Sequence, residues 1–251
     1  MNAWKDSVLR RFDDASESYD AAAATQRRIA GSLCRRILAL SLPPAPEVLE
    51  IGCGTGFLGR VLAPRLKGGW LATDLSPRMA AACARRAGPG MTVRVMDGEC
   101  PDLPGRSFDL IVSNLAVQWF LDPAAGLIRL HRLLRPGGLL AVTTLGQGTF
   151  AEWRELCHGA GVEPGTPGYP SAEGLAARLG AGSVVQGHAC PLPCGDLRGF
   201  LEHLRGTGAR TRAPHHPGLS PAALGRILRL HGAAPFRPTY DVLTVLWTKE
   251  C

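Results

Sequence analysis

Short apolar runs alternate with amphipathic stretches between residues 46 and 145 of this chain. Five runs have the length of strands and are mainly apolar, at residues 47–51, 70–75, 93–96, 108–114 and 139–145. Strands buried on both faces have this composition, and helices between them place such strands in parallel. The pattern therefore predicts a doubly wound α/β fold around a mostly parallel sheet.

Helix starts are marked twice by a capping residue followed by proline, at Ser76-Pro77 and at Asp122-Pro123. Serine and aspartate are good N-caps, and proline suits the first helical position. After the second start, four leucines recur on one helical face, and we expect this helix to continue to the Pro-Gly-Gly at 136–138. The leucines are Leu127, Leu130, Leu133 and Leu134.

The regular alternation weakens after residue 145. Helical patterns occupy 150–161, 171–180, 196–209 and 219–232, and strand patterns occupy 183–192 and 240–250. Two late strands separated by a helical block favour a seven-stranded sheet completed by an antiparallel pair. We therefore expect a helical arm (1–45), an α/β core (46–194), a helical lid inserted over the active site (195–238) and a closing edge strand (239–251).

Composition argues for an ordinary globular protein, with 45% apolar and 20% charged residues. The N-terminus mixes charges and has no signal-peptide pattern, and no apolar run approaches the ~20 residues of a spanning helix. We expect a cytoplasmic protein without membrane association. Its eight cysteines are dispersed, as reduced thiols are, and Cys190 and Cys194 lack the spacing of a standard zinc pair, so no metal is expected.

The net charge of +7 is concentrated in the predicted lid. Residues 195–238 contain two acidic residues and seven arginines, namely Arg198, Arg205, Arg210, Arg212, Arg226, Arg229 and Arg237. A basic surface favours an acidic partner, which could be nucleic acid, anionic lipid or an acidic carrier protein. A solvated arginine-rich face explains the same charge equally well.

A glycine-rich turn follows the first predicted strand, with Glu50 before it and Gly52, Gly54 and Gly56 within it. Glycines permit unusual backbone angles and close approach of a ligand. A dinucleotide fingerprint starting at Gly52 requires glycine at position 57, where this chain has Phe57. The turn alone is weak evidence, because any tight strand-to-helix turn can look like this.

Acidic residues follow the next two strands at Asp74 and Asp97. A carboxylate at the first position can accept hydrogen bonds from both ribose hydroxyls, and one at the second can accept from an adenine amino group. Simple capping is the alternative role for both carboxylates.

Taken together, E-x-G-x-G-x-G, Asp74 and Asp97 resemble the class I S-adenosylmethionine (SAM)-dependent methyltransferases, over about residues 46–145. The resemblance implies a Rossmann-like fold with SAM at the carboxyl ends of the strands. The implied SAM-binding set is Gln26, Glu50, Gly52, Gly54, Gly56, Asp74, Leu75, Asp97, Gly98 and Asn114.

Further motifs extend from residue 12 to residue 247: Phe12, Tyr19-Asp20 and Gln26, then "SNLAVQW" (113–119), "TTLGQGTF" (143–150), "LRGTGAR" (204–210) and "PTYDVLTVLW" (238–247). In this order they resemble the malonyl-[acyl-carrier-protein] O-methyltransferases of biotin synthesis. The resemblance implies methyl transfer from SAM to the free carboxylate of a malonyl thioester, with an acyl-carrier protein as partner. The methyl ester hides a charge, so that fatty-acid synthesis can elongate the product towards pimeloyl.

The acceptor chemistry is consistent with "SNLAVQW", which has no acidic group at the end of the fourth strand. A carboxylate is already deprotonated at pH 7, so no residue is expected to act as acid or base. Enzymes that methylate base amino groups carry an acidic or amide residue followed by Pro-Pro-aromatic at this place. Nucleic acid is therefore not expected as a partner.

The predicted substrate-binding residues are Tyr19, Gln118, Trp119 and Arg205. Arg205 is the first candidate for a bidentate pair with the malonyl carboxylate, and Arg210 is the second. Tyr19 and Trp119 have a plain packing role as the alternative, Tyr19 against Phe12 and Trp119 beneath the lid.

Other functions stay open at this point. A related family comprises SAM-dependent assembly factors of respiratory complex I, which hydroxylate a protein arginine. A methyltransferase for another small carboxylic acid is a second alternative. A third is a SAM-sensing module whose basic lid binds RNA, which would show steep salt dependence.

Overall fold

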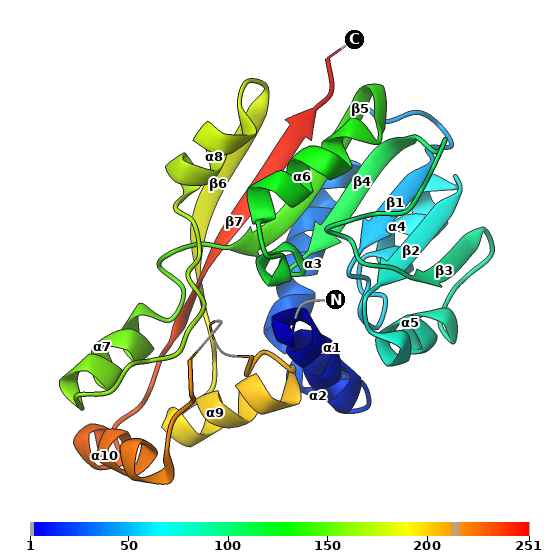
Figure 1. Ribbon diagram of the computed structural model, residues 1–251. Coiled ribbons are helices and arrows are strands. Elements are labelled where there is room, and N and C mark those ends of the chain that lie inside the picture. Colours follow the sequence, from blue (N-terminus) through cyan, green and yellow to red (C-terminus); the bar gives the residue numbers. More distant parts are fainter. Residues whose placement is uncertain (1–2, 212, 214–215, 251) are drawn as a thin grey trace.

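The computed structural model describes residues 3–211, 213 and 216–250 (Figure 1). Within these residues, seven strands form one sheet in the order β3-β2-β1-β4-β5-β7-β6. The strands are β1 (Val48–Ile51), β2 (Trp70–Asp74), β3 (Met91–Val95), β4 (Phe108–Asn114), β5 (Leu134–Leu145), β6 (Ser183–Pro191) and β7 (Thr239–Thr248). Strands β1 to β5 are mutually parallel, and β7 is antiparallel to both of its neighbours. The predicted doubly wound, mostly parallel sheet is confirmed.

The last strand lies elsewhere than predicted. Residues 239–251 do not supply an edge strand, because β7 hydrogen-bonds to β5 on one side and to β6 on the other. The edge strand is β6, whose Gln186 and His188 are exposed. The physical reason is burial: Val242, Leu243 and Val245 of β7 are all buried, and such a strand needs cover on both faces and both edges.

Helices cover both faces of the sheet (Figure 1). One face carries α3 (Ala24–Leu38), α4 (Gly59–Leu66) and α5 (Pro77–Ala84), and the other carries α6 (Pro123–Arg132) and α8 (Ala172–Leu179). The predicted caps are present: the Ser76 side chain accepts a hydrogen bond from the Met79 amide, and the Asp122 side chain accepts one from the Ala125 amide.

Helix α6 ends earlier than predicted, at Arg132. The Leu133 carbonyl accepts a hydrogen bond from the Phe108 amide, and Leu134 already pairs with Phe108 in the sheet. Pro-Gly-Gly therefore lies within an irregular start of β5, where Gly137 has a positive φ of 74°. Pairing with β4 outweighs the local helical pattern.

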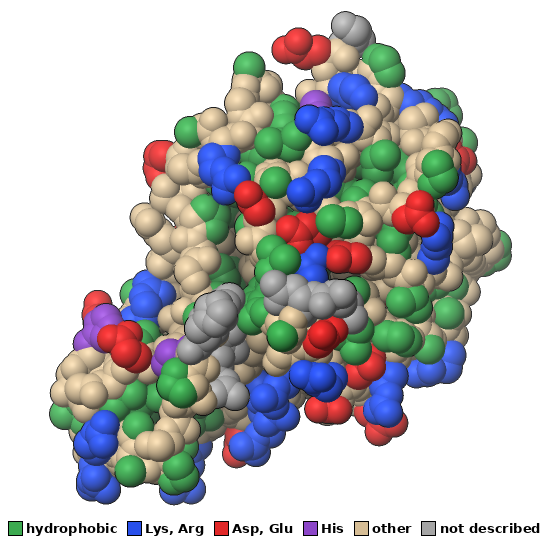
Figure 2. All heavy atoms as spheres, in the orientation of Figure 1, with side chains coloured by type: hydrophobic (Ala, Val, Ile, Leu, Met, Phe, Trp, Pro, Cys, Tyr) green, Lys and Arg blue, Asp and Glu red, His purple; other side chains and the backbone are tan. Residues whose placement is uncertain are grey.

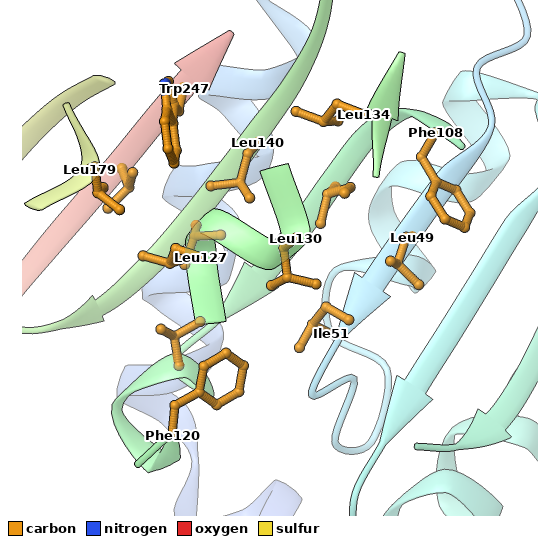
Figure 3. Packing of buried hydrophobic residues seen from close by; sticks show 14 of the residues in the cluster. Leu49, Ile51, Phe108, Phe120, Leu127, Leu130, Leu134, Leu140, Leu179 and Trp247 are labelled. Carbon is orange, nitrogen blue, oxygen red and sulfur yellow. The ribbon is translucent and has the colours of Figure 1, made fainter. Parts of the chain in front are cut away.

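Leucines of α6 point into the core of their face, where Leu127 and Leu130 pack over Leu49, Ile51 and Leu140 (Figure 3). Full burial of one such side chain contributes about 2–3 kcal/mol. A second cluster fills the opposite face beneath α3 and α4. Both clusters leave the carboxyl ends of β1, β2 and β4 free to build a site.

Five further helices gather at that end of the sheet: α1 (Ala3–Ala15), α2 (Tyr19–Ala22), α7 (Ala151–Gly159), α9 (Leu197–Gly206) and α10 (Pro221–His231) (Figure 1). A short 3₁₀ turn, η1 (Val117–Trp119), follows β4. Around Phe200, a third cluster joins α7, α9 and α10 to the start of β7. Among the described helices, none combines the length and apolar character needed to cross a membrane.

Candidate functional site

A cleft of about 670 Å³, its mouth included, lies at the carboxyl ends of β1, β2 and β4. It is lined by most of the predicted SAM-binding set: Gly52, Gly54, Asp74, Leu75, Asp97, Gly98 and Asn114. The topology explains this convergence, because neighbouring parallel strands end at the same edge of the sheet.

The glycine turn has two different requirements. Gly52 has φ +64°, and a Cβ there would lie 2.2 Å from the Ala116 Cβ, so this glycine lets the turn pass close to the end of β4. Gly54 has φ +53°, and a Cβ there would meet nothing within 4 Å. Gly54 therefore presents bare backbone towards open space, which is what close approach of a ligand needs.

Asp74 is fixed at the end of β2 by two backbone donors. One carboxylate oxygen accepts a hydrogen bond from the Gly54 amide and the other accepts one from the Ser76 amide, each at 2.8 Å. Burial raises the pKa of Asp74 to about 6, and the two amides oppose that rise. The group is ionised at pH 7, and each oxygen keeps a lone pair for a ligand hydroxyl.

Lys5 of α1 lies in the same cleft, and sequence reasoning missed it. Its ammonium is 2.6 Å from carboxylate oxygens of both Asp97 and Glu99. Burial lowers the pKa of Lys5, but the two carboxylates more than offset this and the net shift is upward. A usable signal was present, because Lys5, Val8, Phe12 and Ala15 share a helical face that the fold buries or half-buries.

Two aspartates tie the N-terminal helices to the cofactor turn. Asp13 accepts hydrogen bonds from the Ser76 hydroxyl and the Arg78 amide. Asp20 accepts a hydrogen bond from the Thr55 hydroxyl and forms an ion pair with Arg86 at 2.9 Å. The arm is therefore closed over the cleft.

A second cavity of about 420 Å³ adjoins the cleft, since Phe12, Tyr19, Leu115 and Trp119 line both. The three tyrosines of the chain, Tyr19, Tyr169 and Tyr240, all line this cavity. Burial raises the pKa of each phenol, so all three stay protonated and can donate hydrogen bonds.

Tyr240 is held from two sides. Its hydroxyl accepts a hydrogen bond from Gln26 Nε2 at 3.4 Å and shares one with His203 Nε2 at 2.9 Å. Burial lowers the pKa of His203, so the imidazole is neutral at pH 7. This wall of the cavity is polar but carries no formal charge.

Both glutamines of the predicted set line this cavity. Gln118 Nε2 donates to the Leu115 carbonyl at 2.7 Å. The side-chain oxygens of Gln26 and Gln118 are buried, and neither has a hydrogen-bond partner within the described part of the chain. Buried polar atoms of this kind find their partner in an ordered water, an ion or a bound molecule.

Gln26, Glu50 and Gly56 are not brought to the cleft, although they belong to the predicted SAM-binding set. Gln26 lines the second cavity. Glu50 faces α4, where it accepts a hydrogen bond from the Trp70 indole at 2.9 Å, and burial raises its pKa to about 8. Neighbouring strand residues point to opposite faces, so Ile51 takes the place at the cleft. Gly56 packs against Cys83.

The predicted carboxylate partner, Arg205, is not brought to either cavity. Its side chain is exposed on the last turn of α9, whereas Thr207 and Ala209 from the following turn line the second cavity. Arg210, the second candidate, is exposed at the edge of a third cavity. Arg212 lies outside the described residues.

The packing alternative for Tyr19, against Phe12, is also present, whereas the aromatic contacts of Trp119 among the described residues are with α1 and not with the predicted lid. The Tyr19 ring lies 6.5 Å from Phe12, and the Trp119 ring lies 5.6 Å from Phe12 and 6.3 Å from Trp4. Trp119 therefore packs against α1 while lining both cavities. Tyr19 and Trp119 can therefore both line the cavities and pack against the N-terminal arm.

One backbone strain marks the junction of the two cavities. Leu115, which lines both, has φ +52°, a left-handed conformation that is uncommon for a branched side chain. Its amide donates a hydrogen bond to the Thr143 carbonyl at 3.0 Å, which holds the turn in place.

Across the described residues, no group of three or more His, Cys, Asp or Glu side chains could hold a metal ion.

Comparison with known proteins gives a consistent set of relatives. A family model described as "Methyltransferase domain" matches residues 48–138. A malonyl-[acyl-carrier protein] O-methyltransferase of Magnetococcus marinus is 39% identical over 242 residues, which are 93% of this chain and 89% of the relative. The biotin biosynthesis bifunctional protein BioCD of Bordetella avium is 41% identical over 251 residues, 97% of this chain.

The chain spans about half of that bifunctional relative, 52% of its length. Among solved structures, the YcgJ protein of Bacillus subtilis superimposes with a TM-score of 0.65 at 15% identity, covering 88% of this chain and 99% of that one. This likeness concerns the fold alone, and it agrees with the doubly wound, Rossmann-like architecture.

Proposed function

Because this chain belongs to the malonyl-[acyl-carrier protein] O-methyltransferase family, we propose that it transfers a methyl group from SAM to the free carboxylate of a malonyl thioester. The carrier of that thioester is an acyl-carrier protein. The product is the methyl ester that primes pimeloyl formation in biotin synthesis. The observation that carries the proposal is the second cavity, which joins the cofactor cleft and offers neutral hydrogen-bond donors.

The residues of the cleft fit SAM. Gly54 gives the methionine part close access to backbone, and the ionised, fixed carboxylate of Asp74 suits the ribose hydroxyls. Asp97 and Gly98 suit the adenine edge. When bound, SAM supplies an electrophilic methyl group on a positively charged sulfur.

The acceptor needs orientation rather than deprotonation. A malonyl carboxylate in the second cavity is within the enclosure formed by Tyr19, Tyr169 and Tyr240. Phenolic hydroxyls hold it through hydrogen bonds from neutral donors, which lack the additional ion-pair attraction of an arginine. The oxygen that attacks keeps its electron density, while the positive sulfur of SAM balances the buried charge.

Alignment and exclusion of water supply the remaining catalysis. Phe12 and Trp119 line both the cleft and the cavity, and α1 covers the cleft with Lys5 and Val8. As the carboxylate oxygen bonds to the methyl carbon, the carbon–sulfur bond breaks and its electron pair stays on sulfur. No proton moves, so the site requires no acid or base.

Residues 195–238 act as the lid of this site in our proposal, because Thr207 and Ala209 form part of the acceptor wall. Figure 2 shows basic side chains along the edge of the molecule over α9 and α10. An acidic carrier suits this edge. A cytoplasmic setting fits the buried thiols of Cys34, Cys53 and Cys157, which are unpaired.

The test offers methyl-labelled SAM to the protein with malonyl-carrier protein, malonyl-CoA, free malonate, a longer dicarboxyl thioester and bulk RNA. We expect label on the malonyl thioesters that is released as methanol by alkali. Label on a protein side chain or on RNA, or no alkali-labile label with any acceptor, contradicts the proposal. Preference for the longer thioester or for free malonate would identify a different carboxylate substrate.

Tyr240→Phe separates the acceptor site from the cofactor site. It removes the hydroxyl but keeps the packing against Phe150. We expect kcat/KM for the malonyl thioester to fall by about 10- to 100-fold, as loss of one hydrogen bond to a charged group predicts, while the Kd for SAM stays within about twofold. If the variant loses affinity for SAM instead, Tyr240 belongs to the cofactor site and its assignment to the acceptor site is wrong.

A further inference from the structure

A third cavity of about 740 Å³ adjoins the second. Phe150, Tyr169 and Ala209 line both of these cavities, whereas no residue lines both the third cavity and the cofactor cleft. The three spaces therefore lie in series, with the acceptor cavity in the middle. Its described lining comes from α7, α9, the segment 164–169 and residues 209–211, 216 and 219.

The walls of the third cavity are mainly apolar. Trp153, Leu201, Leu204 and Leu219 line it together with Phe150. Two contacts fix the loop wall: the Trp153 indole donates to the Pro164 carbonyl at 3.4 Å, and the Ala213 amide donates to the Gly165 carbonyl at 2.9 Å. A ligand for this space has extended apolar surface.

Polar groups occupy defined places on these walls. The hydroxyl of Thr211 is buried and has no hydrogen-bond partner among the described residues. Arg210 is exposed, and His216 is half-buried. Within the described lining, neither aspartate nor glutamate is present. The cavity therefore suits a chain with a hydrogen-bonding group along its length and an anionic group at its outer end.

We propose that the third cavity binds the linear arm of the thioester substrate, an amide-bearing chain of the pantetheine type that ends in a phosphate ester. This inference rests on the proposed function. The Thr211 hydroxyl hydrogen-bonds to an amide of the arm, the apolar walls pack against its methyl groups, and Arg210 pairs with the phosphate at the mouth. The arm thereby delivers the malonyl carboxylate through the space beside Tyr169 and Ala209.

The arm site assigns a function to an arginine that the acceptor site does not use. A guanidinium is a strong, bidentate partner for phosphate. Placed at the mouth, Arg210 holds the anionic end of the arm without touching the reacting carboxylate. Recognition of the substrate is thus divided between neutral donors inside and a cation outside.

The experiment compares three acceptors that differ only in the arm: malonyl-phosphopantetheine, malonyl-pantetheine without phosphate, and malonyl-N-acetylcysteamine. Leu204→Trp fills the third cavity. We expect it to lower kcat/KM at least about tenfold for the first two acceptors and less than about twofold for the third. Thr211→Val is the milder second variant. We expect it to lower kcat/KM about fivefold for the first two acceptors and less for the third.

Arg210→Ala tests the mouth, with the exposed Arg229→Ala on α10 as the matched control. We expect a loss of about fivefold for malonyl-phosphopantetheine, no change for malonyl-pantetheine, and no change from Arg229→Ala with either acceptor. Equal losses on all three acceptors from Leu204→Trp and Thr211→Val, or no loss from either, overturn the arm site. If the unmodified protein methylates none of these malonyl thioesters, the proposed function itself fails.

Discussion

Replacing Lys5 by methionine tests whether the N-terminal arm is coupled to cofactor binding. Methionine keeps the apolar stem of the side chain but removes the ammonium that lies 2.6 Å from both Asp97 and Glu99. The Lys5 side chain is 7% exposed, that of Glu99 is 5% exposed and that of Asp97 is 31% exposed. The substitution leaves two carboxylates facing each other without their shared cation.

The size of the effect follows from burial. Removing one partner of a fully buried ion pair costs about 3–5 kcal/mol. Glu99 retains hydrogen bonds from the Leu121 and Asp122 amides, and Asp97 is partly hydrated, so about 2–3 kcal/mol is the better figure. Lys5 lies on α1 and lines the cleft, so the substitution destabilises the conformation in which α1 is closed over the cleft. If closure accompanies binding, the Kd for SAM rises roughly 30- to 150-fold.

Calorimetric titration with SAM measures that Kd, and amide exchange over residues 3–15 measures closure of the arm. Lys67→Met is the control, because Lys67 is exposed and distant in sequence from the arm. Lys5→Met combined with Glu99→Gln should recover part of the loss, since one uncompensated charge is then removed. Unchanged SAM affinity together with unchanged exchange in Lys5→Met would refute the coupling.

Three further predictions concern the core around the site. Glu50 has a folded pKa of about 8 against an ordinary 4.5, so the free energy of unfolding should decrease as pH rises from about 4.5 to 8. Chemical denaturation should show a flatter pH profile for Glu50→Gln, and parallel profiles would contradict this. Gly52→Ala should prevent stable folding through its clash with Ala116, whereas Gly54→Ala should cost only about 1–2 kcal/mol yet weaken SAM binding. Equal stability of these two variants in urea would contradict the distinction. Phe200→Ala should destabilise the protein by about 3–5 kcal/mol in denaturant titration, and a loss below about 1 kcal/mol would show that this cluster does not hold the helices together.

The sheet could be predicted because its signals are local. Ser76 and Asp122 start helices by capping their own amides, and apolar runs of strand length indicate buried parallel strands. The end of α6 could not be predicted in the same way, because it depends on pairing of Leu134 with Phe108 in β4. Where tertiary pairing competes with a helical pattern, the sequence of one element is insufficient.

The site shows the same limit. Gly54, Asp74 and Asp97 follow strands, so the topology places them at one edge. The wall of the second cavity instead combines Tyr19 of α2, Tyr169 of the loop before α8 and Tyr240 of β7, and only tertiary packing brings these distant segments together. Charge drew attention to Arg205, but α9 buries Leu197 and Phe200 and leaves that arginine in solvent.

Among the described residues, no arginine lines the second cavity, and this has a physical consequence for the proposed chemistry. A guanidinium beside the malonyl carboxylate would stabilise the ground state through charge-assisted hydrogen bonds, and it would lose that interaction as the oxygen becomes an ester. In the described lining of the second cavity, the donors are neutral, with protonated tyrosines and a neutral His203 behind Tyr240. Their hydrogen bonds to the carboxylate are weaker, so less stabilisation is lost when the carboxylate becomes a neutral ester. The charge of SAM is lost in the same step, so attraction between the two substrates falls as the product forms, and among the described lining residues no cation delays release of the neutral ester.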